Sequence, residues 1–141
     1  MLFRSNSSCY RIFQNKVTWN SAKSKCEASG SKLAVLNTEA EQQALAQVLS
    51  FRYVGMTWIG LHRDPKNKSR WLWVDGSIAD YTDWAKGEPD NEGGREDCVG
   101  IPSYLPPAKW SDMACYSLLS YVCELFTGKL NKFMLDRKSV V

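Results

Sequence analysis

The segment Trp84-Ala85-Lys86-Gly87-Glu88-Pro89-Asp90, continued by Arg95-Glu96-Asp97-Cys98-Val99 and by Trp110-Ser111-Asp112, decides how the chain is interpreted. Four carboxylates lie in it among Gly, Pro and Asn residues, which are typical of loops: Glu88, Asp90, Glu96 and Asp112. Calcium takes several oxygen ligands in flexible geometry. A cis Glu88–Pro89 bond, which costs little before proline, would direct both flanking side chains to one point. The acids alone would fit a solvated acidic loop, but the flanking tryptophans and cysteines favour a metal site.

Motifs on both sides of this segment follow one another in a specific order. They are Trp58-Ile59-Gly60-Leu61, Gly87-Glu88-Pro89-Asp90, Glu96-Asp97-Cys98-Val99, Trp110-Ser111-Asp112 and Val122-Cys123-Glu124. In this order and spacing, the chain resembles the C-type lectin-like domain from about Cys9 to Glu124. The resemblance implies an α+β fold with two helices, antiparallel sheets, long calcium-binding loops and disulfide staples. It divides the chain into an N-terminal extension (1–8), the lectin-like domain (9–125) and a basic tail or linker (126–141).

Composition limits the remaining interpretations. The 141 residues, 44% of them hydrophobic and six of them tryptophan, are enough for one packed domain. The chain has a net charge of +3, and the tail alone has four basic residues against one acidic residue. A body with balanced charge argues against a nucleic-acid partner, which needs clustered positive charge. No apolar run is long enough to span a bilayer. Residues 1–6 lack the apolar core of a signal peptide, so we expect any export signal to be encoded elsewhere.

The cysteines indicate an oxidising compartment. Five are present, at positions 9, 26, 98, 115 and 123, with a single histidine, His62, which argues against a Cys/His zinc site. In a small domain such a set predicts a disulfide framework and an extracellular protein, either secreted or the ectodomain of a membrane protein. Sequence alone allows three pairings of four cysteines. The resemblance implies Cys26–Cys123 and Cys98–Cys115, and leaves Cys9 for an upstream partner, an intermolecular bridge or a free thiol. Asn6 and Asn67 begin sequons that would make an exported chain a glycoprotein.

Local patterns predict two helices followed mainly by strands. Thr18 is placed to cap a helix that has Trp19, Ala22 and Cys26 on one face. Thr38 and Glu41 form a capping-box pattern for a second helix that ends near Leu49. The predicted strands are Tyr10–Phe13, Leu33–Leu36, Thr57–Leu61, Trp71–Val74, Val99–Ile101 and Tyr121–Leu125. This order favours an α+β architecture over a βαβ repeat.

The resemblance also implies the site residues. Glu88, Asp90, Glu96, Ser111 and Asp112 would bind Ca²⁺, and two sugar hydroxyls would complete the calcium shell. Asp90 replaces the asparagine of the mannose-type Glu-Pro-Asn motif, Glu88 replaces the glutamine of the galactose-type Gln-Pro-Asp motif, and Ser111 replaces the usual asparagine. Because a carboxylate only accepts hydrogen bonds whereas an amide donates two, metal binding should survive these changes better than sugar binding. A second calcium site involving Asp64, Asn91 and Asp97 is disfavoured because Lys66 and Lys68 lie in its loop.

Three classes of function are therefore considered. The first is a calcium-dependent carbohydrate-binding module with altered (Glu-Pro-Asp) specificity, whose partners are glycans or glycoproteins. The second is a lectin-like receptor or secreted domain that binds a protein or another non-sugar ligand. The third, an enzyme, is the weakest: Glu88 and Glu96 could form a glycosidase pair, but the chain has one histidine and no activated nucleophile. We expect no enzymatic activity.

Overall fold

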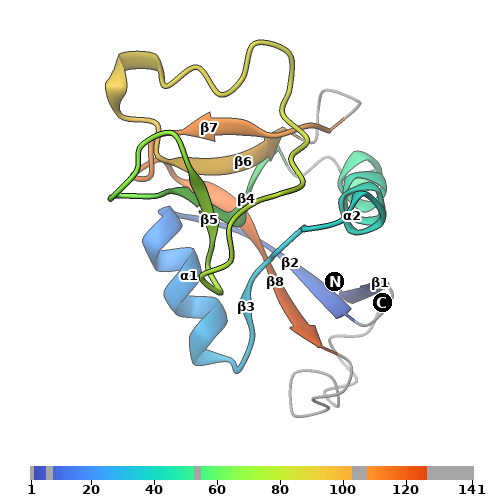
Figure 1. The fold of residues 1–141 in the computed structure, drawn as a ribbon. Helices are drawn as coiled ribbons and strands as arrows, with labels where there is room; N and C mark the ends of the chain where they lie inside the picture. The colour runs from blue at the N-terminus through green and yellow to red at the C-terminus, as the bar shows by residue number, and fades with distance from the viewer. Residues whose placement is uncertain (1, 6–7, 53–54, 103–107, 127–141) are drawn as a thin grey trace.

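The computed structural model describes residues 2–5, 8–52, 55–102 and 108–126, which form two helices and one mixed sheet (Figure 1). The α+β class predicted from the sequence is confirmed. The helices are α1 (Trp19–Ala28) and α2 (Glu39–Arg52), and a short 3-10 turn, η1, covers Glu92–Gly94. The strands are β1 (Leu2–Ser5), β2 (Ser8–Val17), β3 (Lys32–Leu33), β4 (Met56–Arg63), β5 (Trp71–Trp73), β6 (Cys98–Pro102), β7 (Ser111–Met113) and β8 (Leu119–Phe126).

The sheet has the strand order β1-β2-β8-β4-β6-β7, with β3 added to β8 and β5 added to β4. All of its pairings are antiparallel except that of β4 with β8, in which Thr57 lies beside Ser120 and Trp58 beside Tyr121. In Figure 1, α1 and α2 lie on opposite sides of the sheet, and the long segment between β5 and β6 rises above β6 and β7. This arrangement places β7, which carries Ser111 and Asp112, next to that segment.

Several predicted elements have different boundaries in the structure. The strand expected at Tyr10–Phe13 extends over Ser8–Val17, because β2 is hydrogen-bonded to β8 along its length and to β1 near its start. The strand expected at Leu33–Leu36 is shortened to Lys32–Leu33. Beyond it, Val35 donates its amide to the Glu124 side chain instead of to a neighbouring strand. The second helix continues past Leu49 to Arg52.

The two helix starts form as their sequences predict. The Thr18 hydroxyl accepts a hydrogen bond from the amide of Ser21 at 3.2 Å, which satisfies one of the amides that the first helical turn leaves free. The Thr38 hydroxyl accepts from the amide of Glu41, also at 3.2 Å, and donates to the Glu41 carboxylate. Each helix therefore begins where a side-chain oxygen replaces the missing backbone acceptor.

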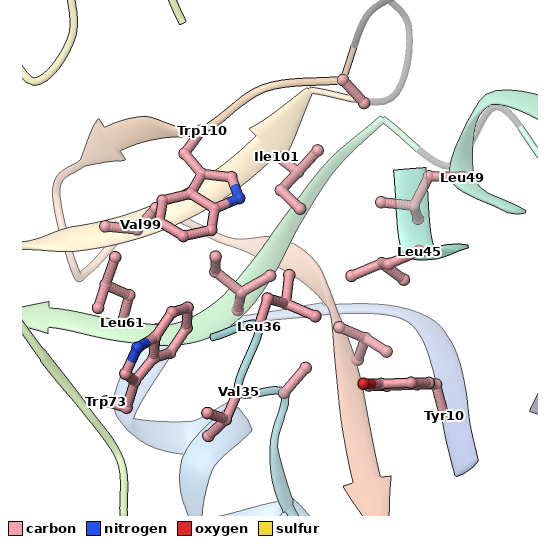
Figure 2. Close-up of a cluster of buried hydrophobic side chains, with 14 of the residues drawn as sticks. Tyr10, Val35, Leu36, Leu45, Leu49, Leu61, Trp73, Val99, Ile101 and Trp110 are labelled. Atoms are coloured by element: carbon pink, nitrogen blue, oxygen red, sulfur yellow. The ribbon is translucent and has the colours of Figure 1, made fainter. Parts of the chain in front are cut away.

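One apolar core lies between α2, the sheet and the segment between β5 and β6 (Figure 2). Trp73 and Trp110 are fully buried and meet edge to face, with ring centroids 5.5 Å apart. Trp71 is buried in the same cluster. The prediction from alternation that Trp71 and Trp73 point to opposite faces of the sheet is therefore wrong, because residues two apart on one strand point to the same face. Both tryptophans contribute to core packing. The core fixes Trp110, and with it the start of β7.

A glycine in β4 allows a close backbone approach in this core. A Cβ atom at Gly60 would lie 2.7 Å from the carbonyl oxygen of Leu33 and 2.9 Å from that of Ala34. The Gly60 amide donates to the Ala34 carbonyl at 2.7 Å. Gly60 is therefore the residue of the Trp58–Leu61 motif that brings β4 against the segment after β3, because any side chain would clash with backbone atoms.

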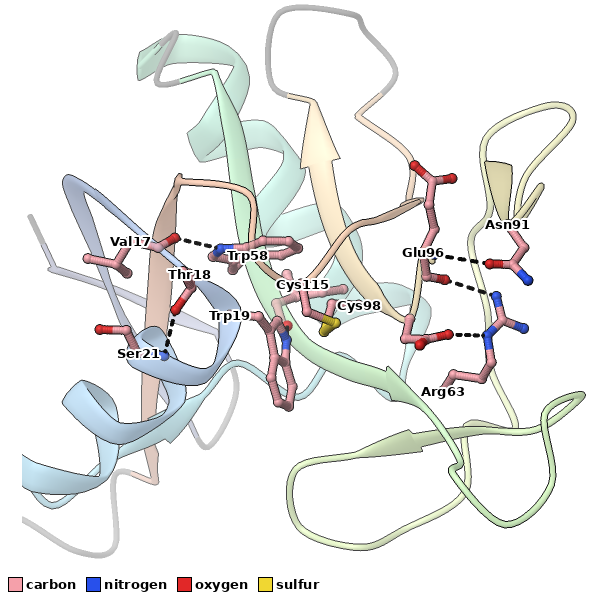
Figure 3. The surroundings of a disulfide bond; sticks show 12 residues. Val17, Thr18, Trp19, Ser21, Trp58, Arg63, Asn91, Glu96, Cys98 and Cys115 are labelled. Carbon is pink, nitrogen blue, oxygen red and sulfur yellow. Dashed lines mark hydrogen bonds and ion pairs between the residues drawn. A yellow bond between two sulfur atoms is a disulfide. The ribbon is translucent and has the colours of Figure 1, made fainter. Parts of the chain in front are cut away.

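Two disulfides staple the domain, and they are those that the resemblance implied. Cys26 of α1 is bonded to Cys123 of β8, and Cys98 of β6 is bonded to Cys115 (Figure 3). Cys9 forms no disulfide within the described residues, and its side chain is buried, at 1% exposed.

The predicted N-terminal extension contributes to the sheet, whereas most of the predicted tail lies outside the described residues. Within the predicted N-terminal extension, Leu2–Ser5 form β1 and pair with β2, and Ser8 begins β2, so these residues belong to the sheet. The predicted tail lies outside the described residues except for Phe126, the last residue of β8. The sequon residue Asn6 also lies outside them. Neither helix in the described part of the chain has the length and apolar composition needed to cross a bilayer.

Candidate metal centre

The segment between β5 and β6 is fixed to the core through Trp110. The Trp110 amide donates to the Asp83 carbonyl at 2.9 Å, and the Ala85 amide donates to the Trp110 carbonyl at 2.8 Å. The Trp110 indole donates to the Gln42 side chain of α2 at 2.7 Å, and Gln42 in turn donates to the Ala108 carbonyl. Both polar atoms of the buried Gln42 side chain are therefore used to hold the base of the site.

All five predicted site residues line one open hollow of about 260 Å³. Glu88 and Asp90 reach it from the segment above the sheet, Glu96 from just before β6, and Ser111 and Asp112 from β7. The Glu88–Pro89 peptide bond is cis. Asp112 is the most buried of the acids, at 2% exposed, whereas Asp90 is exposed. The structure thus brings together residues that are up to 24 positions apart in the chain.

Glu92 also lines the hollow and was not among the residues expected from the sequence. Oxygen atoms of Glu88, Asp90 and Asp112 can lie within 4.8 Å of one another, and so can those of Asp90, Glu92 and Glu96. Only the spacing of Glu92, two residues after Asp90, could have indicated it. Asp90 belongs to both groups and therefore joins them into one acidic centre.

Backbone amides hold the carboxylates in place. Asp112 accepts from the amides of Asp90 and Asn91, at 3.0 and 2.7 Å. Asn91 adopts a left-handed conformation with φ of 46°, which asparagine tolerates better than most residues. Its side chain accepts from the Glu96 amide at 3.0 Å (Figure 3), and the Glu92 amide donates to both Asp90 and Glu96. The loop that carries the acids is therefore folded around Asp112.

The crowding of these acids changes their proton affinity. Burial, contact with Asp112 and the negative charge of Asp90 raise the pKa of Glu88 to about 7. Burial and contact with Asp90 raise the pKa of Glu96 to about 7 as well. Hydrogen bonds from Glu96 and from the Glu92 amide lower the pKa of Asp90. Burial is the largest cause of both shifts, and the neighbouring carboxylates add to it, so a cation at this position would be favoured over protons as the pH rises.

The geometry fits calcium. Oxygen ligands lie 2.3–2.6 Å from a calcium ion, so two ligands of the same ion are at most about 5 Å apart, and both acidic groups meet this limit. The ligand atoms would all be oxygens, as a hard cation requires. An ion held by the first group would take oxygens from Glu88, Asp90 and Asp112, and an ion held by the second group from Asp90, Glu92 and Glu96. An ion bound here would neutralise the excess charge of the hollow.

The second set of acids is occupied by arginines. Asp64 forms a two-pronged ion pair with Arg70, at 2.8 and 3.0 Å, and Asp97 pairs with Arg63 at 2.9 Å. Lys66, which was expected to disfavour a calcium ion through its charge, contributes its backbone amide to Asp64. The second site is thus opposed mainly by Arg63 and Arg70, which sequence inspection did not single out.

The lectin C-type domain family model matches residues 15–125. The chain belongs to the C-type lectin domain family. It is 37% identical over 123 residues to C-type lectin BML-2 of Bungarus multicinctus, covering 84% of this chain and 77% of that protein. It is 34% identical, with the same coverage, to a C-type lectin mannose-binding isoform of Oxyuranus scutellatus.

A solved structure of the family agrees with this assignment. The carbohydrate-recognition domain of the mouse scavenger receptor C-type lectin superimposes with a TM-score of 0.79 at 32% sequence identity. The match covers 89% of this chain and 95% of that domain. The likeness therefore extends over nearly the whole C-type lectin domain described here.

Proposed function

We propose that this C-type lectin domain is a calcium-dependent carbohydrate-binding module in which Glu88-Pro89-Asp90 alters the sugar specificity. The observation that carries the proposal is the convergence of Glu88, Asp90, Glu96, Ser111 and Asp112 on one open hollow. Calcium at this hollow would present open coordination positions to vicinal hydroxyls of a sugar. The acids would accept hydrogen bonds from those hydroxyls. A relative named for mannose binding supports the substrate class.

The altered specificity follows from counting donors. A bound sugar hydroxyl donates one hydrogen bond to an acid and leaves lone pairs that an amide could satisfy. Asp90 has no proton to give when ionised, and Ser111 has only a hydroxyl on a short side chain. Each buried acceptor left without a donor costs roughly 1–3 kcal/mol, which is about one to two decades of affinity. We therefore expect weak binding of simple mannosides.

The lack of side-chain amide donors also favours a second candidate function, which is recognition of a protein or another non-sugar ligand at the calcium-bound surface. A ligand with its own donors, such as backbone amides, would not need the missing side-chain amides. In either case the chain acts by binding and not by catalysis. The two disulfides support an extracellular location.

The test combines a glycan array with titrations of mannose and galactose at saturating calcium, on the wild type and on Asp90→Asn/Ser111→Asn. Restoring the amides should tighten mannose binding by about 1 kcal/mol for each acceptor satisfied. The two gains need not add, because both residues would contact the same ion. Asp80→Asn is the matched control, since it removes an exposed carboxylate outside the hollow.

Three outcomes discriminate the alternatives. Tight binding of mannose by the wild type would contradict the donor argument. Calcium binding by both proteins without any glycan binding would favour the non-sugar ligand. Failure of the wild type to bind calcium at millimolar concentration would overturn both candidate functions.

A further inference from the structure

Arg63, at the end of β4, lies at the meeting point of three segments that form or flank the metal centre. Its guanidinium group donates to the Asp97 carboxylate at 2.9 Å, to the Lys68 carbonyl at 2.8 Å and to the Glu96 carbonyl at 3.0 Å. The same group forms an ion pair with Asp112 at 3.5 Å. Figure 3 shows the guanidinium group facing Glu96. Its four acceptors are all oxygens, and none of them lies within four residues of Arg63.

The Arg63 side chain is fixed on its remaining side as well. Its guanidinium carbon lies 4.4 Å from the ring centroid of Trp71, a distance typical of a cation–π contact. The side chain is only 10% exposed. A planar guanidinium group can bind several oxygens in fixed directions, which the ammonium of lysine cannot do. The arrangement therefore depends on arginine and not simply on a positive charge.

We propose that Arg63 is a positioning residue for calcium: an internal cation that holds Glu96 and Asp112 in their ligand positions before the metal binds. The inference rests on the calcium-dependent function proposed above. Glu96 is held through its own carbonyl and through the neighbouring Asp97 carboxylate. Asp112 is held at Oδ2, which also accepts the Asn91 amide. Carboxylates that repel one another are thereby kept together without the ion.

The positive charge of Arg63 and its ordering of the ligands should have opposite effects on calcium affinity, so substitutions can separate the two. A positive charge near the site repels calcium, so a residue that acts only through its charge should weaken metal binding. A residue that orders the ligands should strengthen it, because the metal then does not have to order the loop itself. In Arg63→Lys the charge is kept and the fixed set of contacts is lost. In Arg63→Met both are lost.

The matched control is Arg70→Lys. Arg70 also forms a two-pronged ion pair, with Asp64, but it contacts none of the acids that line the hollow. Calcium affinity is measured by isothermal titration calorimetry at pH 7.5, well below the melting temperature of each variant. We expect Arg63→Lys to weaken calcium binding roughly tenfold, as for the loss of a group that supports metal ligands. Arg70→Lys should remain within twofold of the wild type.

A second measurement does not depend on the metal. Endoproteinase Glu-C should cut after the exposed Glu92 in chelator, and the rate reports how often the loop opens. The rate should rise several-fold in Arg63→Lys and stay unchanged in Arg70→Lys. If Arg63→Met binds calcium more tightly than the wild type, or if Arg63→Lys matches the wild type in both measurements, the positioning role is overturned. If the wild type binds no calcium, the proposed function fails, while the cleavage rates still decide whether Arg63 holds the loop.

Discussion

The lower part of the sheet around β2, β8 and α1 and the upper segment 74–97 are attached to the same body by different forces. The lower part is closed by the Cys26–Cys123 disulfide and packed through buried residues such as Trp19 and Trp58. The upper segment carries eight acidic residues against two basic ones. It is held by hydrogen bonds from backbone amides to carboxylates and, at its base, by the packing of Tyr81 and Trp84 against Trp110 and the core. Apolar burial in the first region does not depend on calcium, whereas the second region should respond to cations and to the protonation of its acids.

Removing a disulfide should have the largest effect and should separate the two regions. Cys26→Ser/Cys123→Ser opens a 97-residue interval, which should lower the free energy of unfolding by about 4–5 kcal/mol. Cys98→Ser/Cys115→Ser opens a 17-residue interval and should cost about 3 kcal/mol. Guanidinium unfolding at saturating calcium measures both. Calcium affinity should fall only in the second variant, because Cys98 follows Glu96 and Asp97 directly. Equal calcium affinities in the two variants would contradict this division.

Asp112→Asn tests the upper segment directly. The change removes the buried charge that accepts both the Asp90 and Asn91 amides and pairs with Arg63. We expect calcium affinity to fall about a hundredfold, equivalent to about 2.7 kcal/mol. Calorimetric titration with calcium provides the measurement. Asp83→Asn is the control, since Asp83 pairs with Lys109 outside the hollow, and its calcium affinity should match the wild type.

Gln42→Leu tests the connection between the two regions. Leucine has a similar size but leaves the Trp110 indole and the Ala108 carbonyl without partners, which should cost about 2–3 kcal/mol of unfolding free energy. Thermal and guanidinium unfolding report this loss. The neighbouring Gln43 is exposed and bonds only to Glu39 among the described residues. Gln43→Leu should therefore change stability by less than about 0.5 kcal/mol. Equal effects at the two positions would show that Gln42 is not an anchor.

The pH dependence that Glu88 and Glu96 give to the upper segment should be the smallest effect. Glu88 and Glu96 have pKa values raised to about 7, so the metal-free folded state binds more protons than the unfolded chain between about pH 4.5 and 7. Its stability should therefore decrease as pH rises through this window. Calcium requires the deprotonated acids, so its affinity should increase over the same window, by roughly tenfold or more between pH 6 and 7.5.

Melting temperatures with calcium and with chelator, recorded from pH 5.5 to 8, measure both trends. The difference between the two should widen as pH rises. The double variant Glu88→Gln/Glu96→Gln provides the control, because its metal-free melting temperature should lose this part of the pH dependence. A calcium-induced shift that is the same at pH 5.5 and 8 would contradict the titration of these acids.

Local sequence determined the features that depend on neighbouring residues. Thr18 and Thr38 predicted the two helix starts, because a helix cap needs only a side-chain oxygen within one turn of the amides it satisfies. Short apolar runs predicted where most strands lie, but not the length of β2, which depends on its partner β8. Cysteine content predicted disulfides, but the family resemblance was needed to choose the pairing. The same resemblance brought Glu88, Asp90, Glu96, Ser111 and Asp112 together as an expected site.

Tertiary structure alone decided which groups neutralise and hold those acids. No local pattern connects Arg63 with Lys68, Glu96 and Asp112, or Gln42 of α2 with Trp110 before β7. Such contacts form only when segments distant in the chain are packed against the same core. The strength of an ion pair or a buried hydrogen bond also depends on how much water is excluded around it. Sequence therefore determined the chemical types available at the metal centre, and the packing of β4, β7 and α2 decided their partners and their charge.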